Sequence, residues 1–592
     1  MRRWIVRVIT LSILLCGLAV SVVQAAPAAQ DRFGALESLS AYFPKDTMLY
    51  AATRTDNNFI ASLDRIIQAV ASQLPQGVLP PQFPSTLSTA LDLLMAQAGG
   101  GTFADNVRPW LGDTLAVGIY PAIRSAGGRI VIKITDPKAA ADAVVKTLVS
   151  WTSKQVDGYT LLTPTNSDDH NRIAVYSDVM IVYSWSDDVG PQQVPTVSPN
   201  VTANPYYTMA LARLPESTYD MIAFIDTPLL IAYSQRQGYH SSGDWIVPAA
   251  FYRTLGSTGI GMHVGVDQSL TADVVQTLGN TTGLDALGIR FTGKGVALTP
   301  DILTHVPRNS LFVAQAADVG SILEFVGSGA QSAAKKFQPL LSSIITGVAY
   351  GYSASSAGLV SGTFGSLINS EWANVFFSNL SGYDYTSEIR PLLSGSSALF
   401  LTFNPSYNPN SPTFVNREPF DGALLFEAAD AQTAQQFVTK LQRELAISIY
   451  SSGDDNAARI QEVSLPGGTQ GMSLTIYGQT GQPFDQFIVA NQDKLLIMGT
   501  ARAVNQVLSG DGVGFDTSAS VTLPNAGAAF YVNLPPAQSP EWTAFTRSNP
   551  NDMTLQLLPS VIQSATFTVA GSEQNDLLMR LTLTFPCGDN CG

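Results

Sequence analysis

Two pairs of neighbouring aspartates supply the residue types best suited to binding a metal ion in this chain. Asp168 and Asp169 stand in one predicted loop, and Asp187 and Asp188 follow the next pair of predicted strands. Calcium prefers several oxygen ligands, so the carboxylates would bind it if the two loops met at one end of a sheet. No EF-hand spacing is present, and acidic turns are common on an acidic surface. We therefore favour exposed turns without a cofactor, with a calcium site as the alternative.

Aromatic residues suggest a second kind of chemistry. Trp245, Tyr383 and Tyr385 stand in loops that also contain Gly and Asp, where a flat ring can reach solvent. An exposed ring offers a large apolar face and a polar edge, which suits stacking on a sugar. These three are the candidate binding residues for a glycan or protein partner. Aromatic residues in loops more often pack onto the core, and that interpretation is favoured.

Motifs that would identify an enzyme are absent from the sequence. None of the 4 histidines has the HExxH spacing of a zinc site, and no Gly-x-Ser-x-Gly elbow or Rossmann glycine pattern occurs. The nearest match to a phosphate-binding loop, residues 288–294, is followed by Gly295 where a Ser or Thr must bind magnesium. Because a catalytic triad is defined by geometry and not by sequence spacing, a hydrolase site assembled from distant loops stays open.

Composition limits the class of protein. The chain of 592 residues has 32 Lys and Arg against 46 Asp and Glu, a net charge of −14. A chain this acidic is not expected to bind nucleic acid. With 45% hydrophobic and only 13% charged residues, it can bury large cores, and its length implies more than one domain.

The N-terminal residues have the layout of a secretory signal peptide. Arg2 and Arg3 precede an apolar run over residues 8–23, and a small-x-small cleavage pattern ends at Ala25. We expect a signal peptide at residues 1–25 and a secreted protein located in the periplasm, at the cell surface or outside the cell. The alternative is an uncleaved anchor, because the apolar run approaches the length of a bilayer span. A membrane is expected as a partner only in that case.

The same sequence features recur in the same order in both halves of the chain, which predicts an internal duplication. A Pro turn before a strand, an Arg-Pro dipeptide, an Asp at a helix start, an Asp between paired strands and a Leu-Pro dipeptide each occur twice. Each feature is identified here by the number of its first residue in each half. In the order just given, the matched pairs are Pro44 and Pro307, Arg108 and Arg390, Asp136 and Asp430, Asp178 and Asp493, and Leu214 and Leu523. A cation at the same place in both copies predicts that Arg108 and Arg390 each hold a backbone carbonyl or a carboxylate.

Apolar periodicity predicts the elements between these positions. Amphipathic or capped stretches predict helices at residues 59–70, 87–97, 139–151 and 431–444, and alternating apolar runs predict the strands around them. The pattern indicates an α+β protein with two related units, each an antiparallel sheet with helices packed on one face. The predicted bounds are residues 36–280 for the first unit, 299–586 for the second and 587–592 for a C-terminal tail.

Three phrases together resemble a bacterial family catalogued as domain of unknown function 3352. They are Pro-Lys-Asp-Thr-x-x-Tyr at residues 44–50, Pro-Trp-Leu-Gly-Asp at 109–113 and the capped helix from Asp136. The resemblance covers most of the mature chain and implies an exported protein, but transfers no catalytic residue. The second half departs from the pattern, with Leu-Leu-Ser at 392–394 in place of Trp-Leu-Gly, so a role for Trp110 would not be duplicated.

A non-catalytic binding or scaffold protein of the bacterial cell envelope or cell surface is the favoured function, with a partner that the sequence does not identify. Catalysis needs a positioned nucleophile or acid–base pair, whereas binding requires fewer positioned groups. Two related units side by side also form a cleft, and clefts between domains are preferred ligand sites. A secreted hydrolase is the alternative.

The tail contains two cysteines, Cys587 and Cys591. In an exported protein such a pair is expected to form a small disulfide loop, with a frayed tail as the alternative. A structural zinc site is disfavoured because no neighbouring His or Cys completes a ligand set. Thiol labelling of the exported, unreduced protein should find neither cysteine free, and two reactive thiols would refute the disulfide.

Overall fold

The structure is a computed structural model of the whole chain, and it describes most of the residues. The described residues are 33–73, 86–97, 101–122, 126–147, 151–165, 171–184, 190–236, 255–265, 267–278, 297–318, 392, 395–408, 410–411, 416, 419–452, 458–477, 483–517, 523, 525–547, 558–571 and 576–586. The chain divides into two compact units. Unit 1 comprises residues 1–284 and 569–592, and unit 2 comprises residues 285–568.

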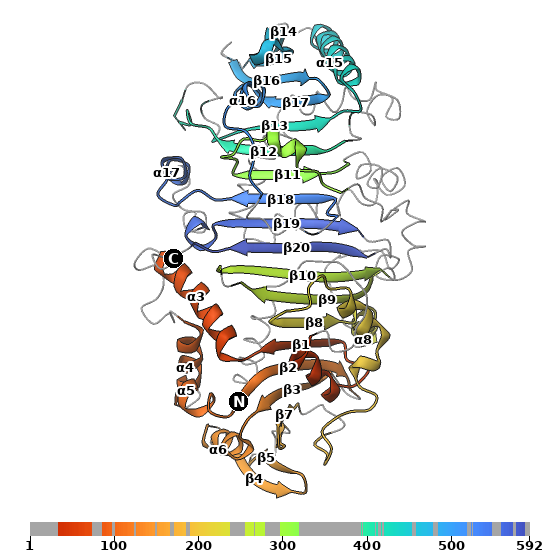
Figure 1. The fold of residues 1–592 in the computed structure, drawn as a ribbon, viewed down its shortest axis with the longest axis vertical. Helices are drawn as coiled ribbons and strands as arrows, with labels where there is room; N and C mark the ends of the chain where they lie inside the picture. The colour runs from red at the N-terminus through yellow and green to blue at the C-terminus, as the bar shows by residue number, and fades with distance from the viewer. Residues whose placement is uncertain are drawn as a thin grey trace. The chain divides into compact units, whose positions relative to one another are not determined.

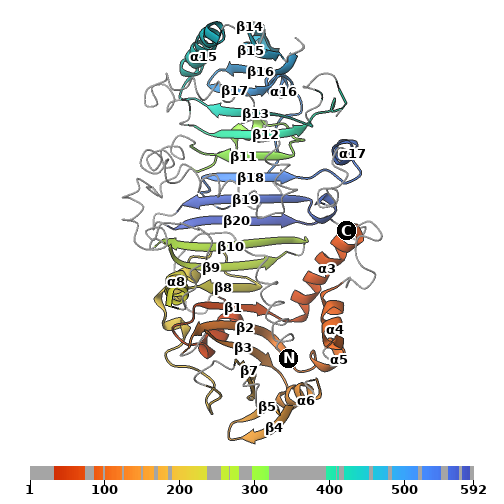
Figure 2. The same cartoon turned by 180° about the vertical axis from the view of Figure 1, so that it is seen from behind.

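The described strands of unit 1 form an antiparallel sheet (Figures 1 and 2). Its hydrogen-bonded order is β4-β5-β6-β7-β3-β2-β1-β8-β9-β10-β20. The strands are β1 (Leu49–Arg54), β2 (Leu111–Pro121), β3 (Ala126–Ile134), β4 (Trp151–Val156), β5 (Tyr159–Pro164), β6 (Arg172–Val175), β7 (Val179–Tyr183), β8 (Met221–Ile225), β9 (Leu255–Val264), β10 (Ser269–Leu278) and β20 (Leu577–Thr584).

Several helices of unit 1, among them α5, α6 and α7, begin at side chains that cap their free backbone N–H groups. Asp136 accepts a hydrogen bond from the Ala139 N–H at 2.9 Å, which starts α6 as predicted. The predicted helix ran on to Trp151, but α6 ends at Thr147 and Trp151 begins β4, where it pairs with Pro164. The helical segments are α2 (Ala35–Ser38), η1 (Leu39–Tyr42), α3 (Asn57–Gln73), α4 (Leu87–Gln97), α5 (Phe103–Asn106), α6 (Pro137–Thr147), η2 (Val201–Ala203), α7 (Pro205–Ala212) and α8 (Thr227–Arg236).

Helical segments pack on both faces of the unit 1 sheet. Tyr50 and Ala51 are neighbours in β1 and therefore point to opposite faces. The Tyr50 ring lies edge-on to Tyr207 of α7, with 5.6 Å between ring centres. Ala51 packs in a cluster with Met262 of β9, and Val264, on the same face as Met262, packs against α3. The expected one-face arrangement is therefore wrong for unit 1, because its central strands are buried on both sides.

Unit 2 has its own antiparallel sheet, in the order β14-β15-β16-β17-β13-β12-β11-β18 among the described strands. Its elements are η3 (Asp301–His305), β11 (Phe312–Ala316), β12 (Ser397–Phe403), β13 (Phe420–Glu427), α15 (Ala431–Ser452), β14 (Ala458–Ser464), η7 (Pro466–Gly468), β15 (Gln470–Tyr477), β16 (Pro483–Gln492), β17 (Leu495–Thr500), α16 (Ala501–Ser509), β18 (Ala528–Asn533) and α17 (Pro540–Arg547). β19 (Ser564–Gly571) crosses the sequence boundary between the units.

The antiparallel α+β class predicted from the sequence is confirmed. The order of the unit 2 strands from β14 to β18 matches the unit 1 order from β4 to β8. Asp430 also caps α15 as Asp136 caps α6, accepting from the Thr433 N–H at 2.7 Å. This order is what an internal duplication would produce, and the duplication itself stays a prediction. The compact units also differ from the predicted bounds at the C-terminal end, because β20 pairs with β10 of unit 1. In the described part of the chain, no helix has the length and apolar character needed to span a membrane.

A buried ionic cluster joins β20 to the rest of unit 1. The Arg580 guanidinium donates to both Asp273 carboxylate oxygens, at 2.7 and 2.8 Å, and to Glu216 at 2.7 Å. The Tyr219 hydroxyl donates to the same Asp273 carboxylate at 2.7 Å, and Arg213 pairs with Asp576. The Arg580 and Asp273 side chains are 4% and 0% exposed. Burial alone would lower the pKa of Arg580, but the hydrogen bonds and charge of Asp273 outweigh it and raise that pKa, so Arg580 stays charged.

Removing the cation of this cluster should destabilise unit 1. Arg580→Ala leaves the Asp273 carboxylate buried without its partner, and the free energy of unfolding should fall by about 3–5 kcal/mol. Urea unfolding followed by circular dichroism measures the change. Lys138→Ala breaks an exposed pair with Asp142 and should leave the urea midpoint unchanged. If Arg580→Ala has the same midpoint as Lys138→Ala, the cluster does not stabilise unit 1.

Candidate functional site

The residues singled out from the sequence lie outside the described residues, so each of those sites stays a prediction. They are the carboxylates Asp168, Asp169, Asp187 and Asp188, the aromatic residues Trp245, Tyr383 and Tyr385, and the cysteines Cys587 and Cys591. Within the described ranges, no group of at least three His, Cys, Asp or Glu residues is placed to hold a metal ion. The structure therefore directs attention to a different part of unit 1.

The partner predicted for the first Arg-Pro phrase is confirmed. Arg108 donates from its guanidinium to the Thr55 carbonyl oxygen at 2.6 Å, which ties the segment before β2 to the end of β1. Its role is structural. Arg390 lies outside the described residues.

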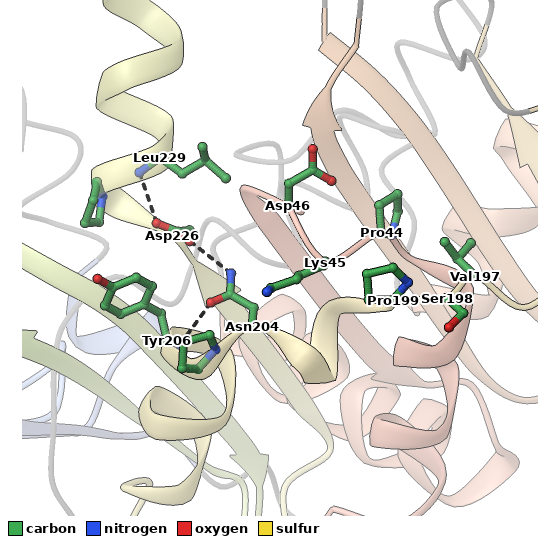
Figure 3. A pocket seen from close by; sticks show the side chains of 12 residues that line it. Pro44, Lys45, Asp46, Val197, Ser198, Pro199, Asn204, Tyr206, Asp226 and Leu229 are labelled. Carbon is green, nitrogen blue, oxygen red and sulfur yellow. Dashed lines mark hydrogen bonds between the residues drawn. The ribbon is translucent and has the colours of Figure 1, made fainter.

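A pocket of about 770 Å³ opens on unit 1 where four chain segments meet (Figure 3). The segments are the turn at residues 44–46, the stretch at 197–199, the start of α7 and the start of α8. Each of them contributes a proline, namely Pro44, Pro199, Pro205 and Pro228. Together with Val197, Tyr206 and Leu229 the prolines make up most of the lining, and the remaining residues are polar or charged. This mixture of apolar surface and a few polar groups is the general character of a small-ligand site.

Hydrogen bonds between the four segments fix the pocket walls. Pro44 forms a β-bridge with Asn200, and the Lys45 N–H donates to the Pro199 carbonyl at 3.1 Å. The Thr47 hydroxyl closes the turn by donating to the Pro44 carbonyl at 2.6 Å. The turn that the sequence identified as a strand opening is therefore also one wall of the pocket.

Two caps fix the opposite wall. The Asn204 side-chain oxygen accepts from the Tyr206 N–H at 2.9 Å and starts α7. Asp226 accepts from the Leu229 N–H at 3.0 Å and starts α8. The Asn204 amide also donates to Asp226 at 3.0 Å, so the two helix starts are held together. A pocket built this way needs little rearrangement to bind a ligand.

An aromatic cluster includes residues next in sequence to two pocket residues, Phe43 before Pro44 and Tyr207 after Tyr206. Tyr50 lies edge-on to Phe43 and to Tyr207, and Tyr207 lies edge-on to Phe224. Burial raises the pKa of Tyr50 and Tyr207 well above the usual tyrosine range, so both stay neutral. Gly118 of β2 is required here, because a Cβ atom at that position would stand 2.2 Å from the Phe43 ring.

The three charged residues that line the pocket, Lys45, Asp46 and Asp226, differ in how they are oriented and bonded. Figure 3 shows the Lys45 amine reaching across the pocket toward Asn204, while the Asp46 carboxylate points away from it. Lys45 is exposed, and within the described residues it makes no side-chain ion pair. Asp226 is 3% exposed and already accepts from Leu229 and Asn204. Lys45 and Asp46 are thus the exposed charged residues of the lining, and Lys45 is the one whose charge points toward the opposite wall in Figure 3.

A histidine–carboxylate pair lies elsewhere in unit 1. His263 Nδ1 stands 2.9 Å from Asp220, which also accepts from the Val264 N–H at 2.9 Å. A carboxylate on Nδ1 is the orienting half of a catalytic triad. His263 is half exposed, and no hydroxyl or thiol of the described residues hydrogen-bonds its other ring nitrogen. The sequence showed no signal for this pair because β8–β9 pairing alone brings the two residues together.

Unit 2 also contains a buried carboxylate, Asp421. Asp421 of β13 pairs with Arg502 at 2.7 Å and accepts from the Thr500 hydroxyl at 3.0 Å. Burial raises the pKa of Asp421 even though the Arg502 charge opposes the shift. Because both of its oxygens have protein partners, we interpret this carboxylate as structural.

Comparisons with known proteins do not assign a family to this chain. No protein-family profile and no curated protein matches it, so the resemblance to domain of unknown function 3352 stays a prediction. Two solved structures, crystal forms I and III of TP0453, are similar over 40% of this chain and 78% and 79% of theirs. Their identities are 10% and 12% and their TM-scores 0.20 and 0.22, too low to carry an argument about fold or function.

The Asp226 cap should be necessary for the pocket wall. Asp226→Ala removes the cap of α8 and leaves the buried Asn204 amide without its acceptor, so the free energy of unfolding should fall by about 2 kcal/mol. Asp46→Ala removes an exposed carboxylate from the same pocket and should change it by less than about 0.5 kcal/mol. Urea unfolding of the two variants side by side tests this. Equal midpoints would show that the cap does not stabilise the wall.

Proposed function

We propose that this protein is an exported, non-catalytic binding protein of the cell envelope or cell surface, and that the unit 1 pocket binds a small ligand. The observation that carries the proposal is the pocket itself. Its volume of about 770 Å³ falls within the range of about 300–1,000 Å³ that is usual for ligand sites. Its walls are fixed by caps and backbone hydrogen bonds. Export is proposed from the signal peptide expected at residues 1–25.

Binding is favoured over catalysis by the groups that line the pocket. The lining contains no His and no Cys, and its Asp226 is engaged in capping α8. A reaction would need a nucleophile or an acid–base pair within hydrogen-bond reach of the substrate. What the pocket offers is apolar surface and one accessible cation, which are the requirements of recognition.

A hydrolase is the second candidate, and the His263–Asp220 pair is the observation that favours it. If that pair were catalytic, His263→Ala would abolish turnover of an activated ester, whereas Lys45→Ala would leave the turnover intact. Calcium binding by the two acidic loops and glycan or protein binding by the aromatic loops are separate proposals, and the pocket does not depend on either.

Ligand binding can be tested with a neutral solvatochromic dye and a matched pair of leucine variants. Leu229 lines the pocket, and Leu230 is its exposed neighbour on α8. Leu229→Gln should weaken binding of Nile red roughly fivefold, because it removes part of one leucine side chain's apolar contact. Leu230→Gln should leave the affinity unchanged. Absence of dye binding to the wild type, or equal effects of the two variants, would overturn the proposed function.

A further inference from the structure

We infer that the unit 1 pocket takes a small molecule with an apolar body and one acidic group, and that Lys45 binds the acid. The inference rests on the proposed function and names the ligand class for the same pocket. Three observations support it, namely the apolar walls, the exposed Tyr206 ring and the charge of Lys45.

The apolar body fits between two rigid walls. Figure 3 shows the Pro44 and Pro199 rings on one side of the pocket, and the Tyr206 ring and the Leu229 side chain on the other. Proline rings have almost no rotamer freedom, so contact with them costs little conformational entropy. An aliphatic or aromatic body can therefore gain apolar contact here without reordering the walls.

One apolar lining residue is itself open to solvent. The Tyr206 side chain lines the pocket and is 44% exposed. An aromatic ring offers a large apolar face with a polar edge, so this ring is available for contact with an apolar ligand.

The available charge selects an acid. The negative charge of Asp226 is offset by the Leu229 N–H, the Asn204 amide and the positive end of α8. The Asp46 carboxylate points away from the Lys45 amine (Figure 3). A carboxylate or phosphate that entered the pocket would therefore meet the Lys45 ammonium donor. Of the two lining carboxylates, Asp226 is already engaged and Asp46 is directed away from that amine.

Comparison with the similar turn of unit 2 shows why Lys45 is available. There the Arg308 side chain donates to the Val513 carbonyl at 2.8 Å and helps hold the turn to its neighbouring segment. In both units a backbone bond also ties the turn, from the Arg308 N–H to the Gly512 carbonyl at 2.8 Å and from the Lys45 N–H to the Pro199 carbonyl at 3.1 Å. Among the described residues the Lys45 side chain makes no bond that matches the Arg308 side-chain bond, so its ammonium can serve a ligand.

Displacement of Nile red by charged and neutral amphiphiles of equal chain length tests the inference. Decanoate should displace the dye from the wild type at lower concentration than decanol or decyltrimethylammonium. Lys45→Gln should weaken decanoate roughly five- to tenfold and leave the dye affinity unchanged, because one partly exposed ion pair is lost. Lys45→Arg should retain the preference, and Lys45→Glu should reverse it. Lys154→Gln, which removes an exposed lysine outside the pocket, is the matched control and should have no effect.

The outcomes separate this inference from the proposed function. If Nile red binds and Leu229→Gln weakens it, but decanoate shows no advantage over decanol, the pocket binds ligands and the acid preference is wrong. The same conclusion follows if Lys45→Gln and Lys154→Gln behave alike. If the dye does not bind at all, the proposed function itself fails. Loss of the decanoate preference in high salt, with dye affinity retained, would support the ion pair with Lys45.

Discussion

The buried pair between Arg580 and Asp273 is the constraint on which unit 1 depends. It joins strands 307 residues apart in sequence, and the neighbouring bond from Arg580 to Glu216 spans 364 residues. A charge buried this deeply is tolerated only with its partner in place, because an unpaired ion in the interior costs several kcal/mol. The final strand is thus part of the first unit, and unit 1 is complete only when the C-terminal residues reach it.

Long-range pairing of this kind has consequences for folding. Contacts of high sequence separation form late, since loop-closure entropy is lost before they contribute energy. Asp273 on β10 and Glu216 before β8 obtain their Arg580 partner only when β20 pairs with β10.

The pocket rests on a different kind of interaction. Its walls are made by short-range caps at Asn204 and Asp226 and by the turn at Thr47, each closing within a few residues. The Asn204–Asp226 bond and the Lys45–Pro199 bond then join those local pieces. The buried rings of Tyr50, Tyr207 and Phe224 pack edge-on against one another, and Tyr207 follows the pocket residue Tyr206 in α7. The site is therefore rigid although it is built from turns and helix ends.

The sequence by itself determined the features that depend on neighbouring residues. The caps at Asp136 and Asp430, the helix at residues 87–97 and the turn at Pro44 were predictable because each depends on hydrogen bonds or apolar spacing within a few residues. The antiparallel α+β class followed from the same local patterns.

Tertiary structure alone decided which distant residues meet. The partner of Arg580, the His263–Asp220 pair and the four prolines of the pocket have no sequence signal, because strand order and segment packing bring them together. The helices on both faces of unit 1 were missed for a related reason. A strand buried on both sides lacks the alternation that reveals which face is covered, so only packing in three dimensions assigns its neighbours.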